Sequence, residues 1–167
     1  MATKTKPKAR AKGSKKASKS VKAEPGFKPL EITLDSKLSY MINSTHPVIA
    51  DLKKLSNEGM VRLHTFDSSN ERIPGLDIKE FRKLLKVTYP QGSPRTLDDH
   101  SDIWLLTDHK AAGRDYFITL NSENILKHEE KLGRLGISVR PPGRFFLREL
   151  KNRLEKSFVE HHEREQA

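Results

Sequence analysis

Residues 101–121, SDIWLLTDHKAAGRDYFITLN, decide the predicted fold. A helix is expected over about residues 99–112, and Gly113 is expected to end it, because glycine readily adopts the left-handed conformation that follows many helices. The run at residues 115–119 predicts a β-strand. A helix that leads directly into a strand is typical of α/β proteins, so this stretch indicates the fold class.

The chain on either side continues the alternation of strands and helices, separated by Gly and Pro residues. Upstream, we expect a strand at 31–34, two helical pieces within 36–58, a strand at 60–66 and a helix at about 77–87. Downstream, we expect a helix that Ser122 caps and that ends near 136, a strand at 137–139 and a C-terminal helix to about 161. This order predicts an α/β fold, a three-layer α/β/α sandwich with a mainly parallel central sheet. Trp104 is expected in its core.

The 167 residues are expected to form one domain with a basic N-terminal extension. The formal net charge is +10, but nine of the 32 basic side chains lie in residues 1–23, which contain no acid. Residues 24–167 therefore hold 23 bases against all 22 acids, and the globular part is nearly neutral. We divide the chain into a tail at 1–28, a domain at 29–152 and a charged end of the last helix at 153–167.

The lysine-rich tail is expected to be disordered, since its composition cannot bury a core. Its clustered charge suits the phosphates of a nucleic acid, which it would bind without reading sequence and with strong salt dependence. Lys12, Lys15 and Lys16 are predicted to contact the substrate. A solubilising extension is the plain alternative, and a transit peptide is a weaker one because arginine is scarce.

Composition also excludes several classes of protein. The chain has no cysteine, so disulfides, thiolate metal sites and cysteine nucleophiles are unavailable. No apolar stretch approaches the roughly 18 residues that a membrane span needs, and the N-terminus lacks the apolar segment of a secretory signal. The seven histidines form no triad pattern and are interpreted as surface or structural residues. A cytoplasmic protein with no membrane partner is expected.

Polar, mostly acidic residues follow the predicted strands. Asp35 comes after the first strand, Glu71 lies shortly after the second, and Asn121 and Glu123 follow the third. Asp102 lies in the first turns of the helix before the third strand, where the helix dipole favours a carboxylate. Because ligands of parallel sheets bind outside the carboxyl ends of the strands, these residues are expected at one site.

Carboxylates at one edge of a sheet repel one another unless a cation neutralises them. Mg²⁺ or Mn²⁺ suits such a site, since hard ions take oxygen ligands and keep several waters. A bound ion would lower the pKa of a water for in-line attack and offset charge on the phosphoryl oxygens. Hydrolysis of phosphodiesters is therefore the predicted chemistry. Asp98 and Asp99 lie close enough to Asp102 to modulate a metal.

Residues 102–126 resemble the C-terminal half of PIN domains. In that family an acid opens a helix, a small residue and a glycine lead into a strand, and the strand ends in Thr followed by an acidic pair. Residues 136–147, GISVRPPGRFFL, are similar to the family's closing strand, proline and final helix. Ile32-Thr-Leu-Asp35 is similar to its opening strand and first acid. The resemblance covers about residues 30–152.

The resemblance implies a parallel sheet with a metal site at its carboxyl edge and, commonly, an endoribonuclease that is selective for RNA sequence or structure. Many bacterial members of the family are toxins restrained by an antitoxin, and dimers are common. RNA, an antitoxin protein and a second copy of the chain are therefore the partners that it implies, and Mg²⁺ or Mn²⁺ is the cofactor.

Carried over by position, the resemblance assigns a role to each polar residue of the site. The catalytic residues are Asp35, Glu71, Asp102 and Glu123, the metal ligands are Asp35, Asp102 and Asn121, and Thr119 would hydrogen-bond the site or a substrate phosphate. Asn121 stands where the family has an aspartate, so an oxygen ligand is kept and a charge is lost. Glu123 matches the second acid of that pair and could supply the charge.

Each acid also has an ordinary structural interpretation. Asp35 could cap the following helix, Asp102 could be a first-turn acid, and Glu71 could be a solvated loop charge. Three functions stay open: a metal-dependent ribonuclease, a PIN-like domain that binds RNA or a partner without cutting, and a protein that binds nucleic acid through its tail. The pair Asp35 and Asp102 favours the first function, and Asn121 favours the second.

Overall fold

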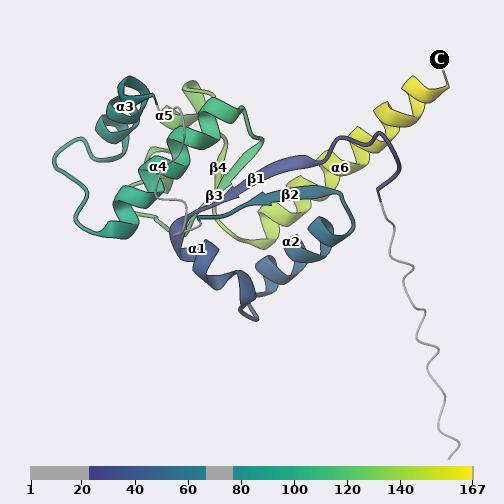
Figure 1. The fold of residues 1–167 in the computed structure, drawn as a ribbon, viewed down its shortest axis with the longest axis horizontal. Coiled ribbons are helices and arrows are strands. Elements are labelled where there is room, and N and C mark those ends of the chain that lie inside the picture. The colour runs from purple at the N-terminus through teal and green to yellow at the C-terminus, as the bar shows by residue number, and fades with distance from the viewer. Residues whose placement is uncertain (1–22, 67–76, 167) are drawn as a thin grey trace, which may run out of the picture.

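The computed structural model describes residues 23–66 and 77–166 (Figure 1). Its centre is a sheet of four strands in which every neighbouring pair is parallel. The strands are β1 Leu30–Leu34, β2 Val61–His64, β3 Tyr116–Ile118 and β4 Val139–Arg140, in the spatial order β2-β1-β3-β4. The predicted α/β class and parallel sheet are therefore confirmed.

Helices cover both faces of the sheet (Figure 1). One face carries α1 Ser36–Tyr40, α2 Pro47–Asn57 and α6 Arg144–Glu165, and the other carries α3 Ile78–Thr88, α4 Leu97–Ala112 and α5 Glu129–Arg134. Two short 3₁₀ helices, η1 Met41–Asn43 and η2 Leu126–His128, follow α1 and precede α5. This arrangement is compatible with the predicted three-layer sandwich. Within the described ranges, no helix has the length and apolar character needed to cross a membrane.

Alternation along β3 divides the apolar core between the two faces. Tyr116 and Ile118 belong to a cluster with β1, β2, α2 and α6, whereas Phe117 belongs to a cluster with α3, α4 and α5. Phe117 and Ile118 are both fully buried. A strand that is apolar on both faces is typical of a parallel sheet covered by helices on both sides.

The segment that decided the fold class has the predicted structure. α4 ends at Ala112, and Gly113 follows it with a left-handed φ of 62°. The helix begins two residues earlier than predicted, because the Thr96 hydroxyl accepts from the amide of Asp99 and the Asp99 carboxylate accepts from the amide of Thr96. This reciprocal capping box fixes the start of α4 at Leu97.

The predicted cap of the next helix is wrong. Ser122 starts no helix, because residues 122–125 form turns and helical structure begins only at Leu126. Asn121 organises this turn: its side-chain oxygen accepts from the amide of Asn124, and its backbone carbonyl accepts from the amide of Leu126. An asparagine side chain competes for nearby amides and thereby favours a turn over a helix.

Trp104 does not lie in the core, which corrects the prediction. Its side chain is 36% exposed, and its ring packs against Phe81 with centroids 4.5 Å apart. Leu105 and Leu106 are buried. Successive residues of a helix point in directions about 100° apart, so a run of apolar residues cannot face the sheet at every position.

The packed region is wider than the predicted domain at 29–152. Phe27 is buried and stacks on Phe158 of α6, with ring centroids 4.3 Å apart. Leu154 is buried in the same apolar cluster. α6 runs unbroken past residue 152, so this helix belongs to the fold along most of its length.

Phe27→Ala is expected to lower the free energy of unfolding by about 2 kcal/mol, because it removes a buried ring and its stacking contact. Phe145→Ala is the matched control, since Phe145 is 82% exposed, and it is expected to change stability by less than about 0.5 kcal/mol. Urea unfolding followed by circular dichroism measures both changes. Equal effects of the two substitutions would contradict the packing of Phe27.

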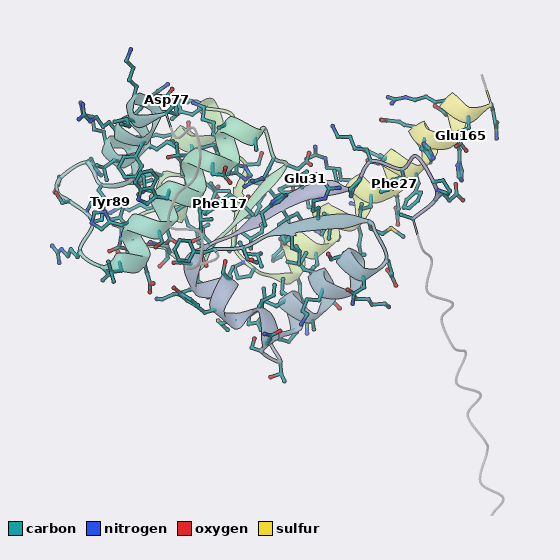
Figure 2. The ribbon with its side chains drawn as sticks, viewed as in Figure 1. Phe27, Glu31, Asp77, Tyr89, Phe117 and Glu165 are labelled. Carbon is teal, nitrogen blue, oxygen red and sulfur yellow. The ribbon has the colours of Figure 1, made fainter. Side chains whose placement is uncertain are left out.

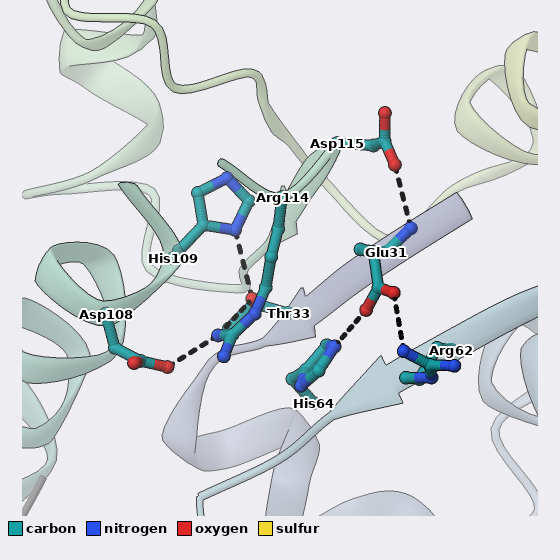
Figure 3. Close-up of polar contacts among 8 residues, drawn as sticks. All are labelled: Glu31, Thr33, Arg62, His64, Asp108, His109, Arg114 and Asp115. Carbon is teal, nitrogen blue, oxygen red and sulfur yellow. Dashed lines mark hydrogen bonds and ion pairs between the residues drawn. The ribbon is translucent and has the colours of Figure 1, made fainter. Parts of the chain in front are cut away.

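A polar network lies between β1 and α4 (Figure 3). The hydroxyl of Thr33 lies 3.0 Å from Nδ1 of His109 and accepts a hydrogen bond from Arg114 at 3.3 Å. Arg114 also pairs with Asp108 at 2.6 Å. Nearer the start of β1, the carboxylate of Glu31 pairs with Arg62 and His64 of β2.

His109 is fully buried in this network, as is Thr33. Its Nε2 has no hydrogen-bond partner among residues 23–66 and 77–166, and its ring meets Phe117 edge-on at 5.7 Å. Burial is the main cause that lowers the pKa of His109 to about 3, and the charges of Arg114 and His64 lower it further. His109 is therefore a neutral structural residue, as the sequence predicted.

Candidate active site

The order of the strands creates a crossing point at one edge of the sheet. The chain leaves β1, forms β2 on one side of it, and then returns to form β3 on the other side. In open parallel sheets, ligands bind at such a point, outside the carboxyl ends of the two diverging strands. Asp35 directly follows β1, and Thr119 and Asn121 follow β3. The fold therefore brings these predicted site residues together.

Asp35 is 1% exposed and accepts three hydrogen bonds. Its Oδ1 accepts from the amide of Leu38 at 2.7 Å, which caps α1. Its Oδ2 accepts from the hydroxyl of Thr119 at 2.7 Å and from the amide of Leu120 at 2.8 Å. The carboxylate thus caps a helix and joins β1 to the end of β3. A carboxylate offers about four lone-pair sites, so one remains for a ligand.

Asp102 reaches the same point from α4. Its Oδ1 accepts from the amide of Ser36 at 3.0 Å and from the Ser36 hydroxyl at 2.7 Å. Its Oδ2 has one long contact, 3.4 Å from the side-chain amide of Asn121. Asp102 therefore contacts the residue that directly follows Asp35, and it lies close enough for the charge of Asp35 to affect it. Oδ2 of Asp102 is the least engaged carboxylate oxygen of the pair.

The pKa of Asp102 is raised to about 6. Burial is the main cause, the charge of Asp35 adds to it, and hydrogen bonds from Ser36 and Asn121 oppose it. A buried carboxylate near a second carboxylate, without a cation between them, is expected to have its pKa raised in this way. Asp102 is therefore the member of the pair whose charge depends on what binds beside it.

Asn121 faces the site with its amide nitrogen. That nitrogen donates to Asp102, while the side-chain oxygen accepts from the amide of Asn124 at 3.1 Å. The oxygen has a second lone pair, which is the only one available for a ligand in this arrangement. The metal-binding role of Asn121 thus stays a prediction.

A cleft of about 300 Å³ opens beside Asp102. Lys37 and Glu123 are exposed residues of its lining, and Asp98 and Asp99 lie in the lining as well, so their effect on a metal stays a prediction. Lys37 is a cation that the sequence analysis missed, although it stands two residues after Asp35. Its ammonium group could contact a phosphate bound next to the carboxylates.

A second cleft of about 740 Å³ adjoins the first and shares Asp99 and Glu123 with it. Arg95, Lys127 and Tyr89 line this larger cleft. Burial raises the pKa of Tyr89, and the nearby carboxylate of Asp99 raises it further, so its hydroxyl stays protonated. The sequence analysis missed this cleft because its lining comes from loops whose positions depend on tertiary packing.

Four of the predicted site residues lie outside the described residues. They are Glu71, Lys12, Lys15 and Lys16. The structure thus brings together Asp35, Asp102, Thr119 and Asn121, and it places Glu123 at the edge of the same cleft.

The oxygen atoms at this edge of the sheet can serve as ligands for Mg²⁺ or Mn²⁺. Among the described residues, no three acidic or histidine side chains at this edge bring ligand atoms within 4.8 Å of one another. A hard divalent ion needs only one or two carboxylates when it keeps several waters. Oδ2 of Asp102 and the remaining lone pair of Asp35 meet that need, so the residues fit the ion.

No protein-family model, curated protein or solved structure matches this chain.

Proposed function

We propose that this protein is a Mg²⁺- or Mn²⁺-dependent endoribonuclease with a PIN-like domain, acting on RNA in the cytoplasm. One observation carries the proposal: two buried carboxylates, Asp35 and Asp102, lie side by side at the crossing point of a parallel sheet. Placing two such groups together is unfavourable without a cation. A shared ion is the simplest reason for a protein to keep them there.

The proposed division of roles follows from the hydrogen bonds. Asp102 would bind the ion through Oδ2, its less engaged oxygen, while Ser36 fixes the orientation of the carboxylate. Asp35 would bind with its one remaining lone pair, and Thr119 holds it in place by donating a hydrogen bond. When bound, the ion would supply an activated water and offset the charge of the phosphate.

The clefts are expected to bind the RNA strand around the scissile phosphate. Lys37 lies close enough to the carboxylates to contact that phosphate, and Arg95 and Lys127 line the larger cleft, where neighbouring phosphates would lie. Electrostatic contacts of this kind bind nucleic acid without reading its sequence. The tail at residues 1–28 would add further contacts of the same type.

One observation favours a second candidate, a PIN-like domain that binds RNA or a partner protein without cutting. Asn121 donates a hydrogen bond to Asp102 where a further carboxylate would strengthen a metal site. This donor stabilises the charged form of Asp102 without an ion. An antitoxin partner and a homodimer stay predictions under either candidate.

The deciding experiment is cleavage of a mixed RNA pool by the full chain with Mg²⁺ or Mn²⁺. Discrete products are expected with either ion, and none with EDTA, because the attacking water needs the ion. A chain lacking residues 1–22 is expected to cleave as well, but to bind RNA more weakly and with a shallower salt dependence.

The other outcomes separate the alternatives. RNA binding without any ion-dependent product would contradict the nuclease and support the binding domain. If removal of residues 1–22 abolishes all RNA binding, the tail alone is responsible for that binding.

A further inference from the structure

A second group of ligand-bearing side chains lies at the C-terminal end of α6, far from Tyr89 and the candidate active site (Figure 2). Glu24, His161 and Glu165 bring one ligand atom each to within 4.8 Å of the others. His161 and Glu165 are four residues apart, so they share one face of the helix. Glu24 comes from the segment before β1.

The nitrogen of His161 that faces this group is unsatisfied. Its Nε2 is buried and has no hydrogen-bond partner among the described residues, and the nearest carboxylate oxygen, Oε1 of Glu165, is 3.5 Å away. A buried polar atom without a partner is unfavourable and rare. The distance is too long for a hydrogen bond, but it leaves room for an ion between the two groups.

The imidazole is held in this orientation by the packing of the N-terminal segment. Phe27 meets the ring of His161 edge-on, with centroids 6.2 Å apart. Gly26 has a φ of 87°, and a Cβ atom at this position would lie 3.3 Å from Cε1 of His161. A residue with a side chain would strain the backbone and crowd the ring, so glycine lets the segment approach closely.

The charge and the donor types both favour a divalent transition metal. Neither Glu24 nor Glu165 pairs with a lysine or arginine among the described residues. His162 lies near Glu24, with its Nδ1 3.5 Å from Oε2, but it is not a member of the group whose ligand atoms converge. One imidazole and two carboxylates form a zinc-type donor set in a protein without cysteine, and a water can take the fourth position. The negative end of the α6 dipole also favours a cation at this place.

We propose that Glu24, His161 and Glu165 bind Zn²⁺, with a water as the fourth ligand. The ion would join the segment before β1 to the last turns of α6. It would thereby fix the point from which residues 1–22 extend from the domain. Because the ligands converge only in the folded chain, binding would also raise the stability of the fold.

Titration calorimetry of the full chain with ZnCl₂, after removal of any histidine tag, tests the proposal. The wild type is expected to bind one Zn²⁺ at this site, and His161→Gln and Glu165→Gln are each expected to weaken binding by more than about tenfold. Glu163→Gln is the matched control, since it removes the same charge from the same turn of α6 and leaves the ligands intact. Asp102→Asn is expected to keep the Zn²⁺ binding that His161→Gln and Glu165→Gln lose, which separates this site from the candidate active site.

Thermal unfolding provides an independent measurement. Zn²⁺ is expected to raise the Tm of the wild type and of Glu163→Gln, but not that of Glu165→Gln, whose exposed side chain is not needed for folding. Unchanged affinity in His161→Gln and Glu165→Gln would overturn the proposal, as would the absence of zinc binding by the wild type. Co²⁺ in place of Zn²⁺ should give the visible absorption of a four-coordinate site.

Discussion

Asp102→Asn is expected to make the protein more stable and to inactivate it. The pKa of Asp102 is about 6 in the folded protein, above its ordinary value of 3.8. The folded state therefore holds the proton more tightly, and stability falls as the pH rises from 3.8 to 6. Above pH 6 the charged carboxylate lowers stability by about 3 kcal/mol. Asparagine removes this charge and still accepts hydrogen bonds from Ser36. The substitution also weakens the contact with Asn121, which offsets part of this benefit. We therefore expect the free energy of unfolding to rise by about 1 to 2 kcal/mol at pH 7.5.

The same substitution removes the oxygen that we assign to the metal. Ion-dependent RNA cleavage is expected to fall by more than about a hundredfold. Asp51→Asn is the control, because it removes one negative charge from an exposed position of α2. Urea unfolding and RNA cleavage of both variants, without and with Mg²⁺, measure the two effects. A destabilised variant, or one with full activity, would refute the role given to Asp102.

His109 is expected to make the folded protein sensitive to acid. Its pKa is about 3 when folded and 6.5 in the reference state, so the unfolded chain takes up a proton that the folded protein excludes. Stability is fully present above pH 6.5 and is lost as the pH falls toward 3. The loss amounts to about 2 kcal/mol at pH 5. The groups that shift the pKa of His109 include no carboxylate that would favour its protonation, because Arg114 and His64 both lower the pKa.

His109→Asn separates this effect from that of Asp102. Asp102 becomes protonated over part of the same range and stabilises the protein as the pH falls, so the wild-type profile combines two opposing changes. In His109→Asn the titrating ring is gone, and an amide nitrogen can replace Nδ1 beside Thr33. The difference in unfolding free energy between wild type and variant should shrink by about 2 kcal/mol from pH 7 to pH 5. A difference that does not change with pH would show that His109 is not buried and neutral.

Local sequence patterns predicted those helices and strands whose formation depends on residues close together in the chain. α4, Gly113 and β3 follow from a helical pattern, a glycine and an apolar run, each of which acts within a few residues. The placement of Asp35 and Asp102 was also predictable in outline. Once a parallel sheet is inferred, residues that follow its strands must share one edge.

The sequence was less informative where side chains from distant segments decide the structure. Asn121 gives its oxygen to a local turn, so the helix predicted from Ser122 starts later. Phe27 belongs to the core because α6 places Phe158 beneath it, over a separation that no local pattern reveals. The cleft lined by Lys127 and Arg95 depends in the same way on how loops pack.

The position of α6 has a consequence for synthesis on the ribosome. The cluster that covers one face of β1 and β2 includes Phe146, Leu150 and Leu154. These residues are translated after both strands and α2, so a nascent chain exposes one apolar sheet face until α6 emerges. Surfaces of this kind bind chaperones and associate with other unfinished chains. Translation pauses ahead of codon 144 are therefore expected to lower the yield of folded protein.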